Sequence, residues 1–313
     1  MVKVLVTGGG GFIGSHLVDE LQSNGYETVI LDTVINYKNE KAEYINGSIL
    51  DKKLIGNIID DIDIVYHLAA SFGHKLSMEN PIMDMEINVR GTLNLLEMCK
   101  NSSIKRIVYA SSSAIFGDPK EFPINENSPL DPLTPYSVSK LSGEFYTMIY
   151  HQIYNLPATS IRLFNIYGPR EYPSSYRGVT SRFLFQIMSG KSIKIFGSGE
   201  ETRTLTFVKD AAQGFLKAGT NKDAVGECFN IAGIKEVSVN ELIELLFKVT
   251  NKRVEIIHEK SRLGETSRRF TSIEKSKRIL GYNPQYDLEK GLGLAYEWFQ
   301  ENWDDIVKKQ KNN

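Results

Sequence analysis

Cysteine is scarce in this chain of 313 residues: the sequence holds two, Cys99 and Cys228, far apart. Neither lies in a CxxC pair or beside a cluster of histidines, the patterns that zinc sites and redox motifs use. We therefore expect no disulfide and no metal site, and we expect the protein in a reducing, cytoplasmic compartment.

Long apolar runs and an excess of one charge are also missing. No stretch is apolar enough to suggest a membrane span, and no apolar leader precedes the first predicted strand at Val2. Lys and Arg number 37 against 38 Asp and Glu, a formal net charge of −1. Such a balance creates no field that attracts nucleic acid or an anionic membrane, so we expect neither as a partner.

The sequence does show an alternation of short β-branched runs with amphipathic segments. Strand-like runs occur at residues 2–6, 28–31, 62–68, 104–110 and 158–163, and helical periodicity occurs at 12–23, 81–100 and 135–154. This alternation predicts an α/β fold with a Rossmann-like, doubly wound parallel sheet.

The character of the chain changes after Asn165, where Gly, Pro, Ser and Tyr become frequent and the predicted elements shorten. We expect residues 1–165, rejoined by about 205–220, to form the large domain. Residues 166–204 and 221–313 are expected to form a smaller, mixed α/β portion that binds the substrate.

A glycine-rich loop follows the first strand and opens the first helix. Gly8 allows a tight turn, Gly11 lets the backbone approach a pyrophosphate, and Gly14 lets the helix pack close to the strand. Asp32 ends the second strand, 18 residues after Gly14, where a carboxylate binds ribose hydroxyls. No basic residue directly follows Asp32, so the loop predicts NAD rather than NADP.

Tyr136 and Lys140 stand four residues apart just after Pro135, so both side chains share one face of a helix. A tyrosine is a useful base at neutral pH only if its pKa falls by ~3 units from about 10, which takes about 4 kcal/mol. A nearby ammonium together with an oxidised nicotinamide would favour the phenolate. The spacing alone is common on exposed helices, so its weight comes from the glycine loop.

A run of serines, 111–113, lies at the carboxyl end of a predicted parallel strand, where open α/β sheets place their sites. Taken alone, it fits a polar strand end before the turn at Gly117 equally well. Beside the glycine loop and the Tyr136/Lys140 pair, it predicts a hydroxyl that bonds the sugar oxygen and passes its proton to Tyr136.

Together these residues resemble the extended short-chain dehydrogenase/reductase family, and within it the NAD-dependent epimerase/dehydratase group. The pattern is closest to the UDP-glucose 4-epimerases, and it runs from Lys3 to about Trp298. The matching stretches are TGGGGFIGSHL (7–17), VILD (29–32), HLAA (67–70), INVRGTLNLLE (87–97), ASSSAIFGD (110–118), PYSVSK (135–140), RLFNIYGPR (162–170), IFGSGEETRTLTFVKD (195–210) and RILGYNP (278–284).

The resemblance implies a role for each matching residue. Tyr136 and Lys140 would be the catalytic base and its partner, and Ser112 the catalytic hydroxyl, with Ser113 the alternative. The residues implied to bind NAD are Gly8, Gly11, Phe12, Ile13, Gly14, Asp32, Asn36, Ser48, Ile49, Leu68, Ala69, Ala70, Asn88, Ser111, Tyr136, Lys140 and Phe164, the last beside the nicotinamide. Those implied to bind the sugar nucleotide are Ser112, Asn165, Val179, Lys194, Phe196, Arg203, Arg262 and Glu265, with the two arginines on the pyrophosphate.

Some positions depart from the family pattern. Ser48 and Ser272 stand where aspartate is common, and Ser48 would contact the adenine more weakly. Ala114 stands where dehydratases and decarboxylases carry an acid, so elimination of water would lack its acid–base group. Arg269 falls at a position that gates substrate size in 4-epimerases, and a long cation there disfavours an N-acetyl sugar.

We therefore expect an NAD-dependent UDP-hexose 4-epimerase that acts through a transient 4-keto sugar. A 4,6-dehydratase or reductase, a UDP-glucuronate 4-epimerase and a non-catalytic dinucleotide-binding protein are the alternatives. By resemblance we expect a homodimer built from the segments 81–100 and 135–154, which carry apolar side chains on more than one face.

Overall fold

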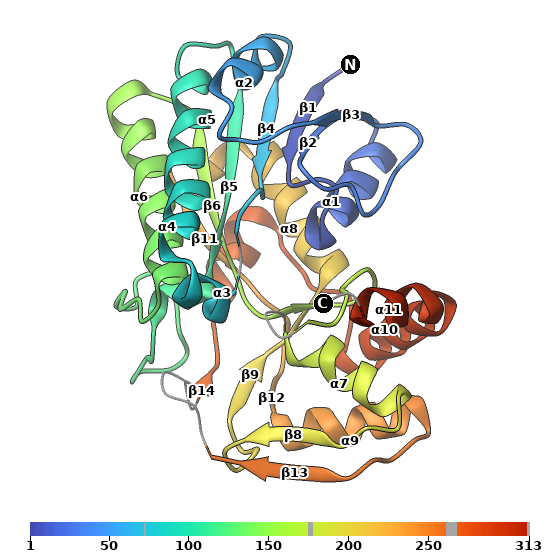
Figure 1. The fold of residues 1–313 in the computed structure, drawn as a ribbon. Helices are drawn as coiled ribbons and strands as arrows, with labels where there is room; N and C mark the ends of the chain where they lie inside the picture. The colour runs from blue at the N-terminus through green and yellow to red at the C-terminus, as the bar shows by residue number, and fades with distance from the viewer. Residues whose placement is uncertain (72, 175–177, 261–267, 312–313) are drawn as a thin grey trace.

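The computed structural model describes residues 1–71, 73–174, 178–260 and 268–311. Its centre is a parallel seven-stranded sheet in the order β11-β6-β5-β4-β1-β2-β3 (Figure 1). The strands are β1 (Lys3–Thr7), β2 (Glu27–Asp32), β3 (Glu43–Asn46), β4 (Ile64–His67), β5 (Arg106–Ser112), β6 (Ala158–Leu163) and β11 (Cys228–Ile231). The strand order reverses beside β1, which creates the switch point where open α/β sheets bind ligands. The predicted fold class is confirmed.

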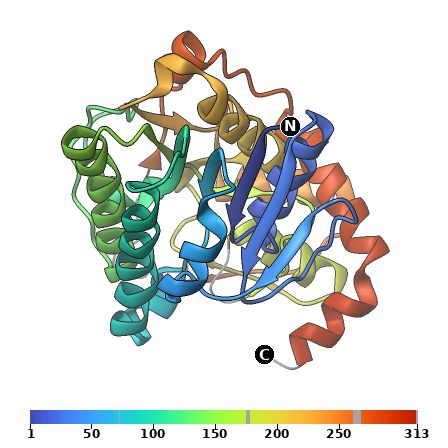
Figure 2. The same ribbon diagram turned by 90° about the horizontal axis from the view of Figure 1, so that it is seen from above.

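Helices cover both faces of this sheet because side chains alternate along each strand (Figures 1 and 2). Val4 and Val6 pack in one core cluster with α1 (Phe12–Ser23) and α8 (Val208–Thr220). Leu5 packs in another with α2 (Lys52–Ile59) and α5 (Gly91–Cys99), beside α6 (Pro135–Tyr154). Strands β1, β2 and β4 near the middle of the sheet are buried on both faces, and the sequence shows them as short apolar runs.

A smaller portion lies at the carboxyl ends of the central strands (Figure 1). Its elements are α7 (Val179–Met188), β8 (Ile193–Phe196), β9 (Thr202–Thr204), β12 (Glu236–Ser238), α9 (Val239–Thr250), β13 (Ile256–Glu259), β14 (Arg268–Arg269), α10 (Leu288–Glu301) and α11 (Trp303–Lys311). Strand β8 pairs with β13, and β9 lies between β12 and β14. Helices α7, α9 and α10 enclose a core of their own with Phe183, Leu246 and Phe299.

Several short elements complete the fold. They are α3 (His74–Glu79), α4 (Pro81–Met85), η1 (Glu86–Arg90), η2 (Ser113–Phe116), β7 (Ile166–Tyr167), β10 (Thr206–Phe207), η3 (Lys222–Ala224) and η4 (Ser276–Leu280). Strands β7 and β10 pair at the junction. Among all described helices, none is long and apolar enough to cross a lipid bilayer.

Two sequence-based expectations need correction. The assignment of all of 221–313 to the smaller portion was wrong for β11, which pairs with β6 because Phe229 and Ile231 are fully buried in the sheet core. The single helix expected at 81–100 is instead α4, the π-helical turn η1 and α5. One extra residue in such a turn rotates the face that follows.

Candidate active site

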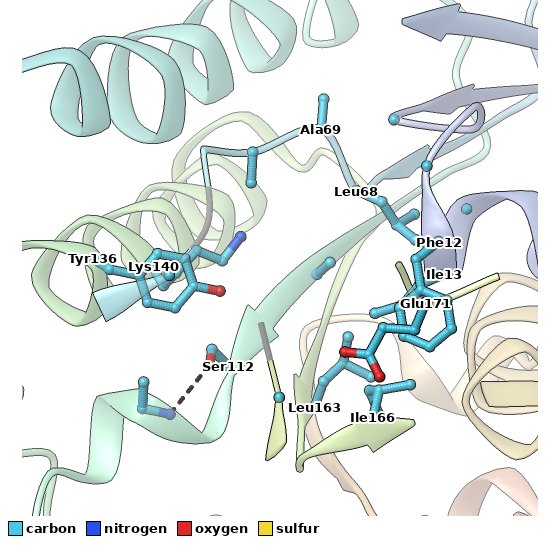
Figure 3. A pocket seen from close by; sticks show the side chains of 18 of the residues that line it. Phe12, Ile13, Leu68, Ala69, Ser112, Tyr136, Lys140, Leu163, Ile166 and Glu171 are labelled. Atoms are coloured by element: carbon cyan, nitrogen blue, oxygen red, sulfur yellow. Dashed lines mark hydrogen bonds between the residues drawn. The ribbon is translucent and has the colours of Figure 1, made fainter. Parts of the chain in front are cut away.

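A cavity of about 860 Å³ opens between the carboxyl ends of the central strands and the smaller portion (Figure 3). Its wall includes most of the residues that the sequence predicted. They are Gly8, Gly11, Phe12, Ile13, Gly14, Asp32, Asn36, Ser48, Ile49, Leu68, Ala69, Ala70, Ser111, Ser112, Tyr136, Lys140, Asn165, Val179 and Arg203. Segments far apart in the sequence thus meet at the predicted switch point.

The glycine loop forms a close turn at one end of this cavity. Gly8 has a φ of +75°, and a Cβ on Gly14 would stand 2.1 Å from the Gly8 carbonyl oxygen, so helix and loop approach as only glycine permits. Gly11 is the N-cap of α1 and supplies no side-chain cap. The first turn of α1 therefore presents backbone N–H groups and the positive end of its dipole to the cavity, which suits a pyrophosphate.

Asp32 lies beside that turn, at the end of β2. Its Oδ2 accepts the Gly10 N–H at 3.0 Å and its Oδ1 the Val34 N–H at 3.2 Å. Burial raises the pKa of the carboxyl, and these amide donors oppose the rise. Ser48 Oγ accepts the Leu50 N–H at 3.1 Å, which fixes its side chain at the wall.

Tyr136 and Lys140 lie together on α6 at the opposite end of the cavity (Figure 3). Thr134 and Ser137 form a capping box at the start of α6, and Pro135 lies in its first turn. The local sequence therefore begins the helix at this point. The Lys140 Nζ lies 4.4 Å from the centre of the Tyr109 ring.

The protein groups alone keep the phenol protonated. Burial raises the pKa of Tyr136 to about 12, and the nearby Ser112 hydroxyl lowers that pKa. Burial also lowers the pKa of Lys140 to about 7, against the pull of nearby carboxylates. Lys140 is not among the groups that lower the pKa of Tyr136, so the predicted fall would have to come from the positive charge of an oxidised nicotinamide.

Ser112 ends β5 and caps the short helix η2 by accepting the Ala114 N–H at 3.2 Å (Figure 3). Of the two predicted serines, it is the one whose hydroxyl lowers the pKa of Tyr136. The Ser113 carbonyl instead accepts a bond from Arg269 at 2.9 Å. Ala114 is buried, so a methyl group occupies the position where an acid would be needed for dehydration.

Several predicted residues lie elsewhere. The Phe164 side chain is fully buried against Phe116, with ring centres 6.0 Å apart, because its neighbours in sequence face the cavity and it faces the core. Asn88 is buried behind the wall. Lys194, on β8, forms an ion pair with Glu259 on β13. Phe196 ends β8 and is not part of the cavity wall. The predicted Arg262 and Glu265 lie outside the described residues.

Other residues line the cavity that the sequence did not single out. His74 begins α3, its Nδ1 lies 2.9 Å from Thr134 Oγ1, and its ring meets the Tyr136 ring edge-on at 5.8 Å. Glu171 is almost fully buried in the wall. Both follow recognisable motifs, HLAA and GPR, and their spacing from those motifs is the signal that would have found them.

Fold and site together define a dinucleotide-binding protein of the Rossmann class, with Tyr136 and Lys140 in the wall of its cavity. Comparison with known proteins narrows this class. Residues 4–232 match the model of the NAD dependent epimerase/dehydratase family. The chain belongs to this family.

Relatives of known or assigned activity cover nearly the whole chain. A putative UDP-glucose 4-epimerase of Methanocaldococcus jannaschii is 41% identical over 305 residues, which cover 96% of this chain and 99% of that protein. The UDP-glucose 4-epimerase of Thermotoga maritima, solved with UDP-glucose, has a TM-score of 0.92 and 33% identity, with coverage of 96% and 100%. The UDP-glucuronic acid 4-epimerase of Bacillus cereus, solved with UDP-glucuronic acid and NAD, has a TM-score of 0.90 and 32% identity, with coverage of 96% and 99%.

The cofactor of this family of sugar-nucleotide enzymes is NAD, as the sequence predicted. The site fits NAD. The glycine loop has no room for a Cβ at Gly14, and no side chain caps the start of α1. Asp32 lies in the cavity wall beside this loop, where its carboxylate could bind the ribose hydroxyls. The Ser111 hydroxyl is buried at the same wall and has no hydrogen-bond partner among the described residues.

Proposed function

We propose that this protein is a UDP-hexose 4-epimerase that interconverts UDP-glucose and UDP-galactose. The observation that carries the proposal is the arrangement of Tyr136, Ser112 and Lys140 at the carboxyl end of β5. A phenol and a serine hydroxyl in the wall of one cavity, with an amine one helical turn away, can move a proton to and from a sugar hydroxyl. The names of the relatives support the choice of a UDP-sugar.

In this proposal the chain's own residues bind, orient and exchange a proton. Tyr136 takes the proton of the 4-hydroxyl, directly or through Ser112, and returns it after the sugar has turned. NAD, held by the glycine loop and Asp32, would supply a reversible hydride acceptor for C4, so no cofactor would be consumed. Arg203 binds the pyrophosphate as a fork of donors, and Asn165 contacts the sugar nucleotide.

The residues around Ser112 favour epimerisation over dehydration. Removal of water from C5 and C6 needs an acid–base group near those atoms, and Ala114 provides a methyl. Arg269 donates to the carbonyls of Ser113 and Gly117 at 2.9 and 3.1 Å, which holds a cation at the sugar end of the cavity. That cation is the observation that favours a second candidate, UDP-glucuronate 4-epimerase.

A substrate panel tests this proposal. The purified enzyme is incubated without added NAD with UDP-glucose, UDP-galactose, UDP-glucuronate and UDP-N-acetylglucosamine, and products are followed by proton NMR. We expect equilibration of the two hexoses and loss of that activity in Tyr136→Phe. A 4-keto-6-deoxy product, a demand for stoichiometric reduced cofactor, or full activity in Tyr136→Phe would each refute it.

We also propose a homodimer formed through α4 and α6. These helices carry exposed apolar side chains on the side away from the sheet, among them Ile82 (70% exposed), Phe145 (51%) and Ile153 (64%). Apolar side chains gathered on one face of a protein commonly mark a protein–protein contact. Two such helices from each subunit would form a four-helix interface.

A further inference from the structure

A buried carboxylate lies behind the catalytic helix and has no assigned role. Asp84, in α4, is 1% exposed, and α4 packs against α6. Its Oδ1 accepts the Asn88 Nδ2–H at 2.9 Å. Its Oδ2 is buried and has no hydrogen-bond partner within 3.5 Å among the described residues. A carboxylate in such a place is costly unless a positive charge lies nearby.

The buried Lys140 amine, on the helix that α4 packs against, is the cation whose charge favours the ionised form of Asp84. It is 4% exposed, and no carboxylate in the described parts of the chain lies within 4.0 Å of its Nζ. The other buried acid nearby, Glu144, is already engaged by Arg162, with N–O distances of 2.6, 3.1 and 3.2 Å. Asp84 is therefore the buried acid left to balance the lysine through space.

Hydrogen bonds hold Asp84 in place and link it to the glycine loop. Asn88 lies in the π-helical turn η1, and its carbonyl accepts the Thr92 hydroxyl at 2.7 Å. Thr92 Oγ1 lies 2.9 Å from His67 Nε2, and His67 Nδ1 lies 2.8 Å from Thr7 Oγ1. All of these side chains are buried, so the network fixes the carboxylate relative to the cavity wall.

We propose that Asp84 is a positioning residue: it keeps the buried Lys140 amine in its charged form and so sets the pH range over which the site works. This inference rests on the proposed roles of Tyr136 and Lys140. Asp84 does not line the cavity, so it acts on the substrate only through those two side chains.

The electrostatics give the direction of the effect. Burial lowers the pKa of Lys140 to about 7, and Asp84 is the first of two carboxylates that oppose this fall, ahead of Glu144. Burial raises the pKa of Tyr136 to about 12, and Asp84 raises it as well. Removing the charge of Asp84 would therefore lower both pKa values. The amine would lose its proton at a lower pH, and the phenol would lose its own at a lower pH.

No other titratable group around these two can replace Asp84. His67 on β4 is neutral, because burial first and the charge of Lys140 second lower its pKa. Burial raises the pKa of Tyr109 on β5 well above 10, so that phenol stays protonated. Burial and Arg269 lower the pKa of His74 on α3. Asp84 itself has a pKa raised by burial, while Ser139, Lys140 and Asn88 favour its charged form.

The test compares pH–rate profiles of the NAD-loaded enzyme and its Asp84→Asn variant, with UDP-galactose as the substrate. We expect both limbs of kcat to move to lower pH by about one unit or more, with KM nearly unchanged. Glu86→Gln, in the adjoining turn, removes an acid that pairs with Arg90 and faces solvent, so it should leave both limbs in place. Asp84→Glu should restore the wild-type limbs.

A spectroscopic titration separates this proposal from the proposed function. The ultraviolet difference between Asp84→Asn and the same variant carrying Tyr136→Phe reports the Tyr136 phenolate, and it should rise at lower pH than the matching wild-type pair. If no sugar nucleotide is turned over by any variant, the proposed function fails while this titration still tests Asp84. Unmoved limbs and an unmoved titration in folded Asp84→Asn would overturn the inference. If Asp84→Asn does not fold, a pH–rate profile of folded Asp84→Ser identical to that of the wild type would overturn the inference.

Discussion

The ion pair between Glu144 and Arg162 joins α6 to the sheet, and we expect its removal to cause a large, measurable loss of stability. Glu144 is in α6, one turn after Lys140, and Arg162 is in β6. Their side chains are 2% and 6% exposed, and the Nη2–Oε1 distance is 2.6 Å. We expect Arg162→Met to destabilise the fold because it leaves the Glu144 carboxylate buried without its partner.

The structure sets the size of this effect. Arg162 gives three N–H···O contacts to Glu144 and one, at 2.8 Å, to the Glu126 carbonyl. After the substitution, Ser160 Oγ at 3.2 Å is the one hydrogen-bond donor left to the carboxylate among the described residues. Breaking a buried pair from one side costs about 3–5 kcal/mol, which is a factor of about 10² to 10³·⁵ in the folding equilibrium.

Urea unfolding, followed by circular dichroism and by tryptophan fluorescence, measures the loss. The matched control is Arg253→Met, which breaks an exposed pair with Glu244 and should cost less than about 1 kcal/mol. The double variant Arg162→Met/Glu144→Leu should regain most of the stability, because an apolar pair of similar volume removes the unpaired charge. A loss in Arg162→Met no larger than in the control would refute the reasoning.

Three further outcomes are expected. Gly14→Ala should weaken NAD binding at least tenfold (about 1.4 kcal/mol) in calorimetry, because its Cβ would stand 2.1 Å from a carbonyl oxygen. Gly293→Ala in α10 is the control, because a Cβ there would have no neighbouring atom within 4 Å. That variant should bind NAD normally and gain up to about 1 kcal/mol in stability. Ser112→Ala should lower kcat by about 10² to 10⁴ with NAD affinity unchanged, and a loss confined to KM would speak against a proton relay. Ile153→Glu should convert a dimer to a monomer in light scattering, and a wild-type monomer would end that proposal.

Local sequence predicted the parts of the molecule that short-range chemistry determines. The glycine loop and the capped start of α6 depend on residues that are neighbours in the sequence. The sequence therefore predicted both the loop around Gly14 and the start of α6 at Pro135. The same holds for the buried strands, whose apolar runs reflect burial on both faces.

Tertiary context decided what the sequence could not show. Four residues beginning at Cys228 join the large sheet because β6 offers a free edge, a fact that no local pattern contains. The turn at Glu86–Arg90 widens into a π-helix within an otherwise helical pattern. Asp84 reaches α6 only through the packing of α4 against that helix, so its place behind α6 follows from no local pattern.

A crystal structure of the enzyme with NAD and UDP-glucose tests the central claim most directly, namely that Tyr136 exchanges its proton with the sugar's 4-hydroxyl. The account predicts the oxygen of that hydroxyl within about 3.2 Å of the Tyr136 Oη or the Ser112 Oγ. It also predicts the nicotinamide ring on the opposite side of C4. A sugar seated with its 2- or 3-hydroxyl at those atoms, or with Tyr136 outside contact range, would contradict it.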